Sequence, residues 1–393
     1  MTWKGGVVAL FENGNDSPLI PDPGPVRAPR RRSRGTRLGT AAIAVALVAL
    51  AGMSFLPTGY VVQQPGPVFN TLGTAETTDG EEIPLISVEG AETFPTAGAL
   101  DLTTVQVRGN RENTPSWFEL AIAWFDPSRA IMPLDSVFPP QQSTEQRNEM
   151  SAQDMVNSKQ DGIAAALLEL GYDIGTKVRI VSIADASPAV GHLEVDDIVL
   201  SANGEKIDTN DELRALIQQG EGATLQLVIE RGGTQQTVEV TPVWVVDEAS
   251  PDGAWRMGVG ITHDYDFPID VTIQLDNVGG PSAGQMFALG IIDTLTPGEL
   301  NGGKQVAGTG TIRADGVVGP IGGIRQKLFG ARGAGAEYFL APATNCDEVV
   351  GHVPDGMRVF AVETLDDSLA VMAGIRGEAS LDTLPSCETA LAR

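Results

Sequence analysis

A serine and a lysine forty-five positions apart are the residues of this 393-residue chain whose types and spacing could carry out covalent chemistry. Ser282 lies in a turn, 279–284, between a stretch that alternates like a half-buried strand (271–275) and apolar residues at helical spacing from Met286 onward. Backbone N–H groups at such a helix start stabilise an oxyanion, together with the helix dipole. Ser282 is therefore a candidate nucleophile for acyl transfer, although the turn taken alone favours an ordinary helix N-cap.

Lys327 makes the chemical interpretation stronger. Helical spacing over 322–331 places it near the face that carries Ile324 and Leu328. Burial disfavours the charged ammonium and lowers the pKa of a lysine, so the neutral amine can accept a serine proton near pH 7. The alternative is a surface lysine whose stem lies along apolar residues, and the presence of Ser282 favours the catalytic interpretation.

The turn around Ser282, the pair Thr309-Gly310 and the run 319–327 together resemble the proteolytic domain of Lon proteases, which use a Ser–Lys dyad. The resemblance spans about 271–342. It implies that Ser282 is the nucleophile, that Lys327 is its general base and that the hydroxyl of Thr309 helps to hold the lysine. Gly280 and Pro281 would support the turn, and the backbone amides from Gly280 to Ser282 are expected to hold the oxyanion.

Two positions depart from the Lon pattern. Gly279 stands where Lon proteases usually have aspartate, and Thr311 replaces the glutamate of the family's Thr-Gly-Glu. These differences affect the expected geometry of the pocket but leave the dyad in place.

A second module is predicted over 155–246. A helix over 161–170, strands over 178–183 and 224–230, and a helix over 211–217 occur in the order of a PDZ domain, which the chain also resembles in 187–189 (Ser-Pro-Ala) and 196–204. PDZ domains bind extended peptide ends by adding a strand to a sheet edge. The resemblance implies a module that recruits substrates or gates the active site, and the alternative is a small α+β spacer.

Residues 38–56 contain no charge and as a helix would be about 28 Å long, close to the hydrocarbon thickness of a bilayer. They predict one transmembrane helix. The segment before it, 1–37, is rich in proline, glycine and arginine and is expected to be a disordered cytoplasmic tail, which places the rest of the chain outside. A signal peptide cleaved after Ala49-Leu50-Ala51 is the alternative.

The charge distribution excludes nucleic-acid binding by the part of the chain after residue 38. The formal net charge is −25, but the first 38 residues hold seven basic and three acidic side chains, so the remainder carries −29. Such a body repels nucleic acid and anionic membrane surfaces.

Residues 57–154 read as a β-rich region to which no chemistry can be assigned. The two cysteines, Cys346 and Cys387, lie beyond the dyad in the part expected outside the cell, where a disulfide is favourable. In the chain-entropy model a bond closing a loop of this length contributes about 4 kcal/mol. Two buried free thiols are the alternative.

Other chemistries have weaker support. The three histidines, His192, His263 and His352, form no zinc motif, although a Ser-His-Asp triad with His263 or His352 stays open. No Gly-x-x-x-x-Gly-Lys-Ser/Thr loop occurs, so proteolysis should be independent of ATP. A phosphate-cradling turn of the galactokinase type would need a longer Gly-Ser-rich pattern than the chain has.

The sequence therefore predicts an α+β protein with one transmembrane helix (38–56), a PDZ domain (155–246) and a Lon-like proteolytic domain (256–393). We expect a membrane-anchored, ATP-independent serine endopeptidase with no cofactor and no metal, acting on peptides or proteins, with homo-oligomers possible from the resemblance alone. The alternative is an inactive Lon-like and PDZ scaffold that binds peptides.

Overall fold

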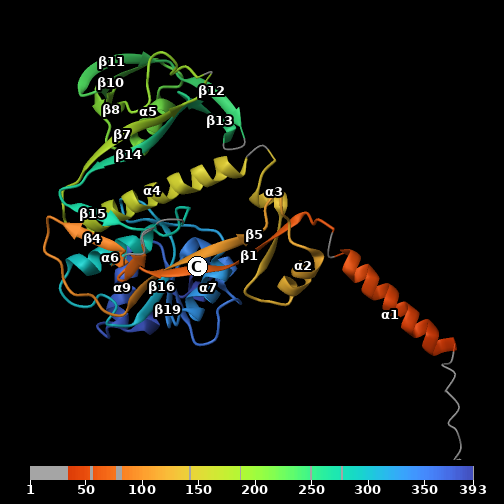
Figure 1. Cartoon of the computed structure of the whole chain (residues 1–393). Helices are drawn as coiled ribbons and strands as arrows, with labels where there is room; N and C mark the ends of the chain where they lie inside the picture. Colours follow the sequence, from red (N-terminus) through yellow and green to blue (C-terminus); the bar gives the residue numbers. More distant parts are fainter. Residues whose placement is uncertain are drawn as a thin grey trace, which may run out of the picture. The chain divides into compact units, whose positions relative to one another are not determined.

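The computed structural model describes residues 34–53, 56–76, 82–140, 143–185, 187–247, 250–275 and 278–392 (Figure 1). The chain divides into two units, Met1–Leu56 and Pro57–Arg393. In the first unit the helix α1 covers Arg34–Met53. Within the described ranges, no helix combines the length and apolarity that crossing a membrane requires. Of the predicted disordered tail (1–37), residues 1–33 lie outside the described residues, whereas 34–37 are helical in α1, which corrects the prediction there. Residues 54–55, near the end of the predicted span, also lie outside the described residues.

The second unit is built on a six-stranded sheet with the order β20-β19-β16-β5-β1-β6. Its strands are β1 (Tyr60–Asn70), β5 (Ala99–Arg108), β6 (Ala130–Pro133), β16 (Gln305–Gly308), β19 (Tyr338–Pro342) and β20 (Arg358–Val362). The strands from β5 to β20 are parallel, and β1 and β6 are added antiparallel. Successive residues are buried in β16, β19, β20 and the first half of β5, so these strands are covered on both faces.

Alternate side chains of this sheet enter two different cores. Leu340 packs with α6 (Gly284–Leu295) and α9 (Leu365–Ile375) on one face, whereas Phe339 packs with α7 (Ile324–Gly333) on the other. Helix α6 is buried from Gly284 to Asp293, which explains why it is apolar almost all round. Together these helices fix the two ends of the predicted dyad.

The sequence predicted a separate β-rich region over 57–154, and the structure corrects this prediction. β5 pairs with β16, so Ala99 lies beside Gln305 and Leu102 beside Gly308, and β1 continues the same sheet. Helices also interrupt the region, namely α2 (Trp117–Trp124), α3 (Leu134–Val137) and the start of α4 (Thr144–Glu169). A pairing across two hundred residues leaves no local pattern, because each strand carries only its own alternation or apolar run.

A second sheet has the order β11-β10-β8-β7-β14. It contains β7 (Gly175–Ile183), β8 (Ile198–Ala202), β10 (Leu225–Arg231), β11 (Thr234–Val240) and β14 (Val259–Asp266), with β9 (Glu205–Lys206) beside β8 and α5 (Asn210–Gln219) against the core. Because β14 pairs with β7, this sheet continues to residue 266. The PDZ domain was predicted to end at 246 and the proteolytic domain to begin at 256, so both predicted boundaries precede β14, the last strand of the PDZ sheet.

Helix α4 is longer than the helix predicted over 161–170. It begins at a capping box between Ser143 and Gln146 and is buried mainly in its second half. It crosses α6 closely, since a Cβ on Gly162 would lie 3.0 Å from the carbonyl oxygen of Gly284. On its other side the Tyr265 hydroxyl of β14 donates to Asp161 at 2.8 Å. Helix α4 thus contacts both α6, which packs on the first sheet, and β14 of the second sheet.

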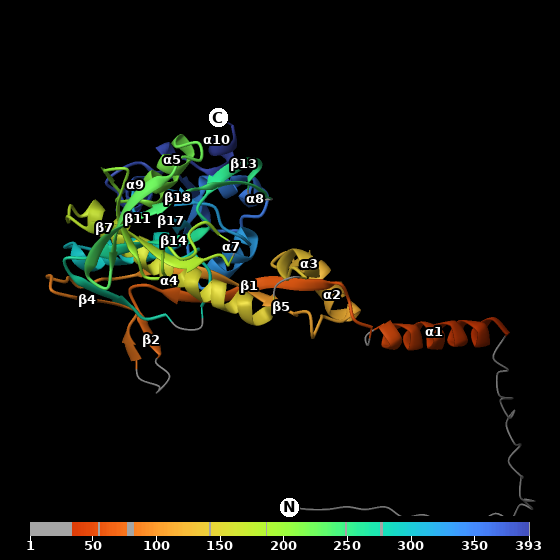
Figure 2. The same ribbon diagram turned by 90° about the horizontal axis from the view of Figure 1, so that it is seen from above.

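The remaining elements are short. They are β2 (Thr74–Glu76), β3 (Glu82–Pro84), β4 (Ile86–Glu89), α3 (Leu134–Val137), β12 (Val243–Asp247), β13 (Ser250–Arg256), β15 (Asp270–Ile273), β17 (Thr311–Ile312), β18 (Val318–Gly319), α8 (Cys346–Val349), α10 (Cys387–Leu391) and two 3₁₀ turns, Ala343–Asn345 and Leu381–Thr383. A disulfide between Cys346 and Cys387 joins the starts of α8 and α10. The mixed α and β content agrees with the sequence prediction. Figure 2 shows the same elements from above.

Candidate active site

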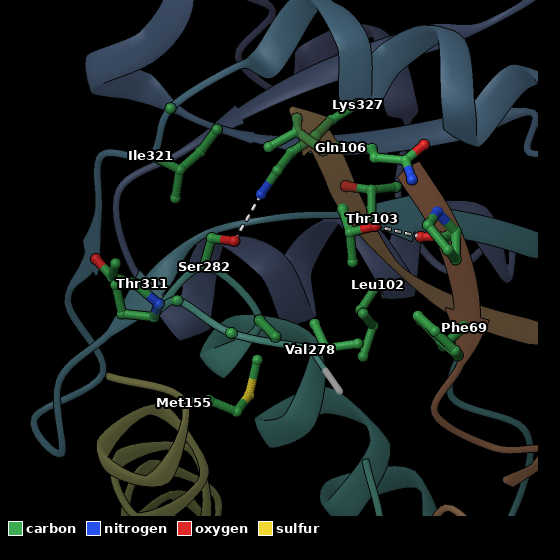
Figure 3. A pocket seen from close by; sticks show the side chains of 18 of the residues that line it. Phe69, Leu102, Thr103, Gln106, Met155, Val278, Ser282, Thr311, Ile321 and Lys327 are labelled. Carbon is green, nitrogen blue, oxygen red and sulfur yellow. Dashed lines mark hydrogen bonds between the residues drawn. The ribbon is translucent and has the colours of Figure 1, made fainter. Parts of the chain in front are cut away.

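Ser282, Thr309 and Lys327 come together in the structure, and Figure 3 shows the hydrogen bond between Lys327 and Ser282. The Nζ atom of Lys327 donates to Ser282 Oγ at 2.6 Å and to Thr309 Oγ1 at 2.7 Å. The Thr309 hydroxyl in turn donates to the carbonyl oxygen of Ser282 at 3.0 Å. The three side chains come from the turn before α6, the end of β16 and the second turn of α7, so the sheet and two helices fix their geometry.

Lys327 is held by a tightly packed helix start. Gly323 precedes α7 with a φ of +70°, and a Cβ there would lie 2.8 Å from Val105 Cγ1. One turn later Lys327 lies between the buried side chains of Ile324 and Leu328 and is only 1% exposed. The expected apolar face of this helix therefore carries the amine into the interior.

Burial lowers the pKa of Lys327 to about 7. The cause is desolvation, which penalises the ammonium more than the neutral amine. Its two side-chain partners, Ser282 and Thr309, are hydroxyl groups, which can hydrogen-bond with either form. A substantial fraction of the amine is therefore neutral near pH 7, and a neutral amine 2.6 Å from a serine oxygen is a suitable general base.

The turn that carries Ser282 departs from one sequence expectation. The N–H of Gly280 donates to the carbonyl oxygen of Ser151 in α4 at 2.7 Å, and Pro281 has no N–H. Of the amides expected to hold an oxyanion between Gly280 and Ser282, this leaves that of Ser282 itself. A hydrogen bond to a helix in a distant part of the chain gives no signal in the turn's own sequence.

A cleft of about 850 Å³ opens beside the dyad. In Figure 3, Met155, Val278 and Leu102 lie on the opposite side of Ser282 from Lys327. Lys327 is the one ionisable side chain among the described residues that line the cleft, which are Gln63, Pro67, Phe69, Leu102, Thr103, Thr104, Val105, Gln106, Met155, Val278, Gly279, Gly280, Pro281, Ser282, Ala283, Thr311, Pro320, Ile321, Gly322 and Lys327. The cleft therefore suits uncharged, apolar side chains of a substrate.

The comparisons with known proteins agree with this geometry. Residues 270–373 match the family model of the Lon protease (S16) C-terminal proteolytic domain, and residues 148–241 match that of the PDZ domain. The chain carries a Lon-type proteolytic domain and a PDZ domain. Both resemblances that were stated from the sequence are thereby confirmed.

Two curated relatives illustrate the extent of the likeness. Lon protease 1 of Sorangium cellulosum is 37% identical over 94 residues, which are 23% of this chain and 11% of the relative. Lon protease 2 of Herpetosiphon aurantiacus is 39% identical over 110 residues, which are 26% of this chain and 13% of the relative. The aligned region is thus about an eighth of the length of these relatives.

Among solved structures, the PDZ domain of the SdrC-like protein from Listeria innocua aligns with 22% of this chain and 92% of its own length. The sequence identity is 19% and the TM-score is 0.20.

The PDZ domain has a cleft of its own, with a volume of about 510 Å³. It lies between α5, which contributes Arg214 and Ile217, and the segment entering β14, which contributes Gly258 and Ile261. In the described part of the sheet β14 is an edge strand, so its free edge can accept an extended peptide.

Helix α4 contributes residues to the proteolytic domain that the sequence analysis missed. Ser158 Oγ donates to the carbonyl oxygen of Pro281 at 3.0 Å, and Lys159 Nζ donates to the carbonyl oxygens of Ile273 and Leu275 at 3.0 and 3.2 Å. Met155 lines the cleft. The helical spacing of these residues indicates a shared face, but the sequence does not tell what that face contacts.

The same helix accounts for the departure at Gly279. A Cβ at this position would lie 2.3 Å from Ser151 Oγ and 3.0 Å from Ser151 Cβ, so any larger side chain would push Ser151 of α4 aside. The other departure, Thr311, lines the cleft beside the turn. No group of three metal-ligating side chains occurs among the residues that the structure describes.

Proposed function

We propose that this chain is an ATP-independent serine endopeptidase in which Ser282 is the nucleophile and Lys327 the general base. The observation that carries the proposal is the 2.6 Å hydrogen bond between Lys327 Nζ and Ser282 Oγ, made by a lysine whose pKa is lowered to about 7. The match to the Lon proteolytic domain supports the class of reaction.

In the proposed reaction the neutral Lys327 amine takes the proton of Ser282 while Oγ attacks the scissile carbonyl carbon. The oxyanion that forms is stabilised by the Ser282 N–H at the start of α6. The tetrahedral intermediate then expels the amine product, which receives the proton from Lys327. A water molecule attacks the acyl-enzyme in the same way, with Lys327 accepting its proton and returning it to Ser282 as the acid product leaves.

Thr309 keeps the amine aimed at the serine. Its hydroxyl contacts both Lys327 Nζ and the Ser282 carbonyl oxygen, so it ties the base to the nucleophile's own backbone. The proposed substrates are flexible or unfolded peptide segments, because this chain contains no Gly-x-x-x-x-Gly-Lys-Ser/Thr loop that would couple ATP hydrolysis to unfolding. The PDZ cleft would recruit such segments or gate their entry.

Cleavage of a fluorogenic peptide with an apolar side chain before the scissile bond, measured without ATP, tests this proposal. We expect turnover by the full chain and none by Ser282→Ala or Lys327→Met. Lys304→Met, which changes an exposed lysine of the same domain, serves as the matched control and should keep full activity. Folded but inactive protein in every form would instead favour the alternative function, a peptide-binding scaffold.

We also propose that the segment 38–56 anchors the chain in a membrane, with the N-terminus cytoplasmic and the proteolytic domain outside. The proposal rests on the uncharged sequence of the segment and on the high exposure of its apolar side chains, such as Leu38 and Val48, each 73% exposed. Retention in the membrane fraction after an alkaline wash is expected. Protection of the proteolytic domain from a protease added to the cytoplasmic side would give the orientation, and release by the wash would refute the anchor.

A further inference from the structure

Helix α2 presents large apolar side chains to solvent. Phe118 is 62% exposed, Trp124 77% and Phe125 87%. We call the exposed set the aromatic patch; its members are Trp117, Phe118, Ile122, Trp124 and Phe125. Soluble surfaces seldom gather five such side chains in one place, so the patch requires a partner.

The patch covers one continuous side of the helix. At about 100° per residue, the exposed positions from Trp124 to Ile122 span an arc of about 160° that contains no polar side chain. The opposite side is fixed to the body, since Leu120 and Ala123 are buried against Val62 of β1. Helix α2 is therefore held rigidly with its aromatic side outward.

Hydrogen bonds from Thr58 hold the start of α2 close in the chain to the end of the proposed anchor. The hydroxyl of Thr58 donates to the carbonyl oxygen of Pro115 at 2.8 Å, and the Thr58 N–H donates to Thr114 Oγ1 at 3.1 Å. These bonds hold the residues just before α2 against Thr58. Leu56, the last residue of the proposed anchor, is two residues earlier, and two residues span at most about 7 Å. In Figures 1 and 2, α2 lies at the end of the sheet where β1 begins.

We propose that the aromatic patch inserts into the interfacial layer of a phospholipid bilayer, beside the point where the chain leaves the membrane. The inference rests on the proposed anchor at 38–56. Tryptophan and other aromatic rings are favoured at this depth because the ring contacts the acyl chains while neighbouring polar groups contact water and headgroups. A second copy of the chain is the other occupant to be tested, but nothing in the chain brings one to this position, whereas its own connectivity brings the bilayer.

The charges around α2 indicate that lipid charge is not required. Arg108 pairs with Glu119 at 3.4 Å and Arg129 with Asp126 at 3.0 Å, and Arg111 pairs with Asp135. Among the described residues, each of these three arginines is paired with a carboxylate, so none of them is an excess cation that would select anionic headgroups. Zwitterionic phosphatidylcholine should therefore suffice. An inserted patch would also hold the cleft at a fixed distance from the membrane, because β1 starts beside α2 and carries Gln63 and Phe69 of the cleft lining.

Tryptophan quenching tests the inference on the full chain. The protein is reconstituted into phosphatidylcholine vesicles whose acyl chains carry bromine, and its emission is compared with that in unbrominated vesicles. The chain has five tryptophans. Replacing Trp117 and Trp124 by phenylalanine should remove at least half of the bromine-dependent quenching, whereas the matched variant, Trp244→Phe with Trp255→Phe, should keep it.

Each other outcome overturns the inference. Equal quenching in both double variants, with the chain still retained on the vesicles after an alkaline wash, refutes the inserted patch while leaving the anchor intact. Release of the chain by the wash refutes the anchor and the inference with it. Loss of an oligomer in Phe118→Ser with Phe125→Ser, seen by light scattering while bromine-dependent quenching is absent, assigns the patch to a second copy of the chain.

Discussion

The cleft of the proteolytic domain and the cleft of the PDZ domain lie beside similar turns, but different elements follow these turns. Each lies beside a turn with a glycine at positive φ, Gly280 at +90° and Gly258 at +73°. The first turn enters a buried helix, α6, and its Ser282 is hydrogen-bonded to Lys327 of α7, which is 1% exposed. The second enters an edge strand, β14, opposite the surface of α5.

This difference separates a site for chemistry from a site for binding. Burying Lys327 costs stability, because the amine loses its hydration, and the same desolvation gives it a pKa near 7. The PDZ cleft needs no buried base, since an edge strand offers its backbone N–H and C=O groups directly. The two clefts should therefore respond independently to mutation, although helix α4 and Tyr265 of β14 connect the two domains.

Loss of the dyad has the largest expected effect. Ser282→Ala should lower kcat for peptide hydrolysis by about 10⁴-fold or more, since removing a nucleophile leaves only binding and oxyanion stabilisation. The affinity of the PDZ cleft for a peptide, measured by fluorescence anisotropy, should stay unchanged in the same variant. A parallel loss of peptide affinity would show that the two clefts are not independent.

The pH dependence of hydrolysis comes next in size. Lys327 must be neutral to accept the serine proton, so activity should fall as pH decreases through about 7 and level off above it. The neutral fraction of Lys327 is about one half at pH 7 and about 1% at pH 5, which predicts a loss of about 50-fold between these two pH values. Initial rates across this range, with the fold monitored by circular dichroism, provide the measurement; a flat profile contradicts the role of Lys327.

Ser158→Ala tests whether α4 positions the nucleophile. Its Oγ holds the carbonyl oxygen of Pro281, directly before Ser282, and losing one such hydrogen bond costs about 1 kcal/mol, or roughly a fivefold decrease in kcat. KM should change little, because the cleft lining is untouched. Ser136→Ala, an exposed serine outside the cleft, is the control. If Ser158→Ala and Ser136→Ala change kcat to the same extent, and also change the free energy of unfolding to the same extent, Ser158 does not position the nucleophile.

The smallest expected effect concerns the PDZ cleft alone. Arg214→Glu places a carboxylate in the lining on α5 and should weaken binding of a peptide with a free C-terminus by about threefold to tenfold. Hydrolysis of a short peptide that reaches the proteolytic cleft directly should be unaffected. If that hydrolysis rises or falls with the substitution, the PDZ domain gates the active site rather than only recruiting substrates.

The local elements around the site could be predicted from sequence because their signals are local. The alternation before 276, the helical spacing after Met286 and the apolar face around Lys327 correspond to β15, α6 and α7 within a few residues. Ser282 and Lys327 were chosen from their local patterns, and the resemblance to Lon supported them and added Thr309; the structure brings the three side chains within hydrogen-bonding distance.

The environment of the dyad could not be predicted in this way. β5 is assigned to the catalytic sheet by a partner two hundred residues away, and β14 completes the PDZ sheet after a hairpin that interrupts the module. The Gly280 amide is bonded to Ser151, which the turn's own sequence does not indicate. Each of these is a contact between distant segments, for which the sequence of either partner carries no specific pattern.

The sequence by itself thus determined the residue types that can do the chemistry and the short elements that carry them, because hydrophobic periodicity and turn residues act over a few positions. Only the tertiary structure decided that Lys327 loses its solvent, that α4 closes over the nucleophile turn and that α2 faces outward. Burial and desolvation depend on what packs against a residue from the rest of the chain, and that packing is also what brings the pKa of the lysine to about 7.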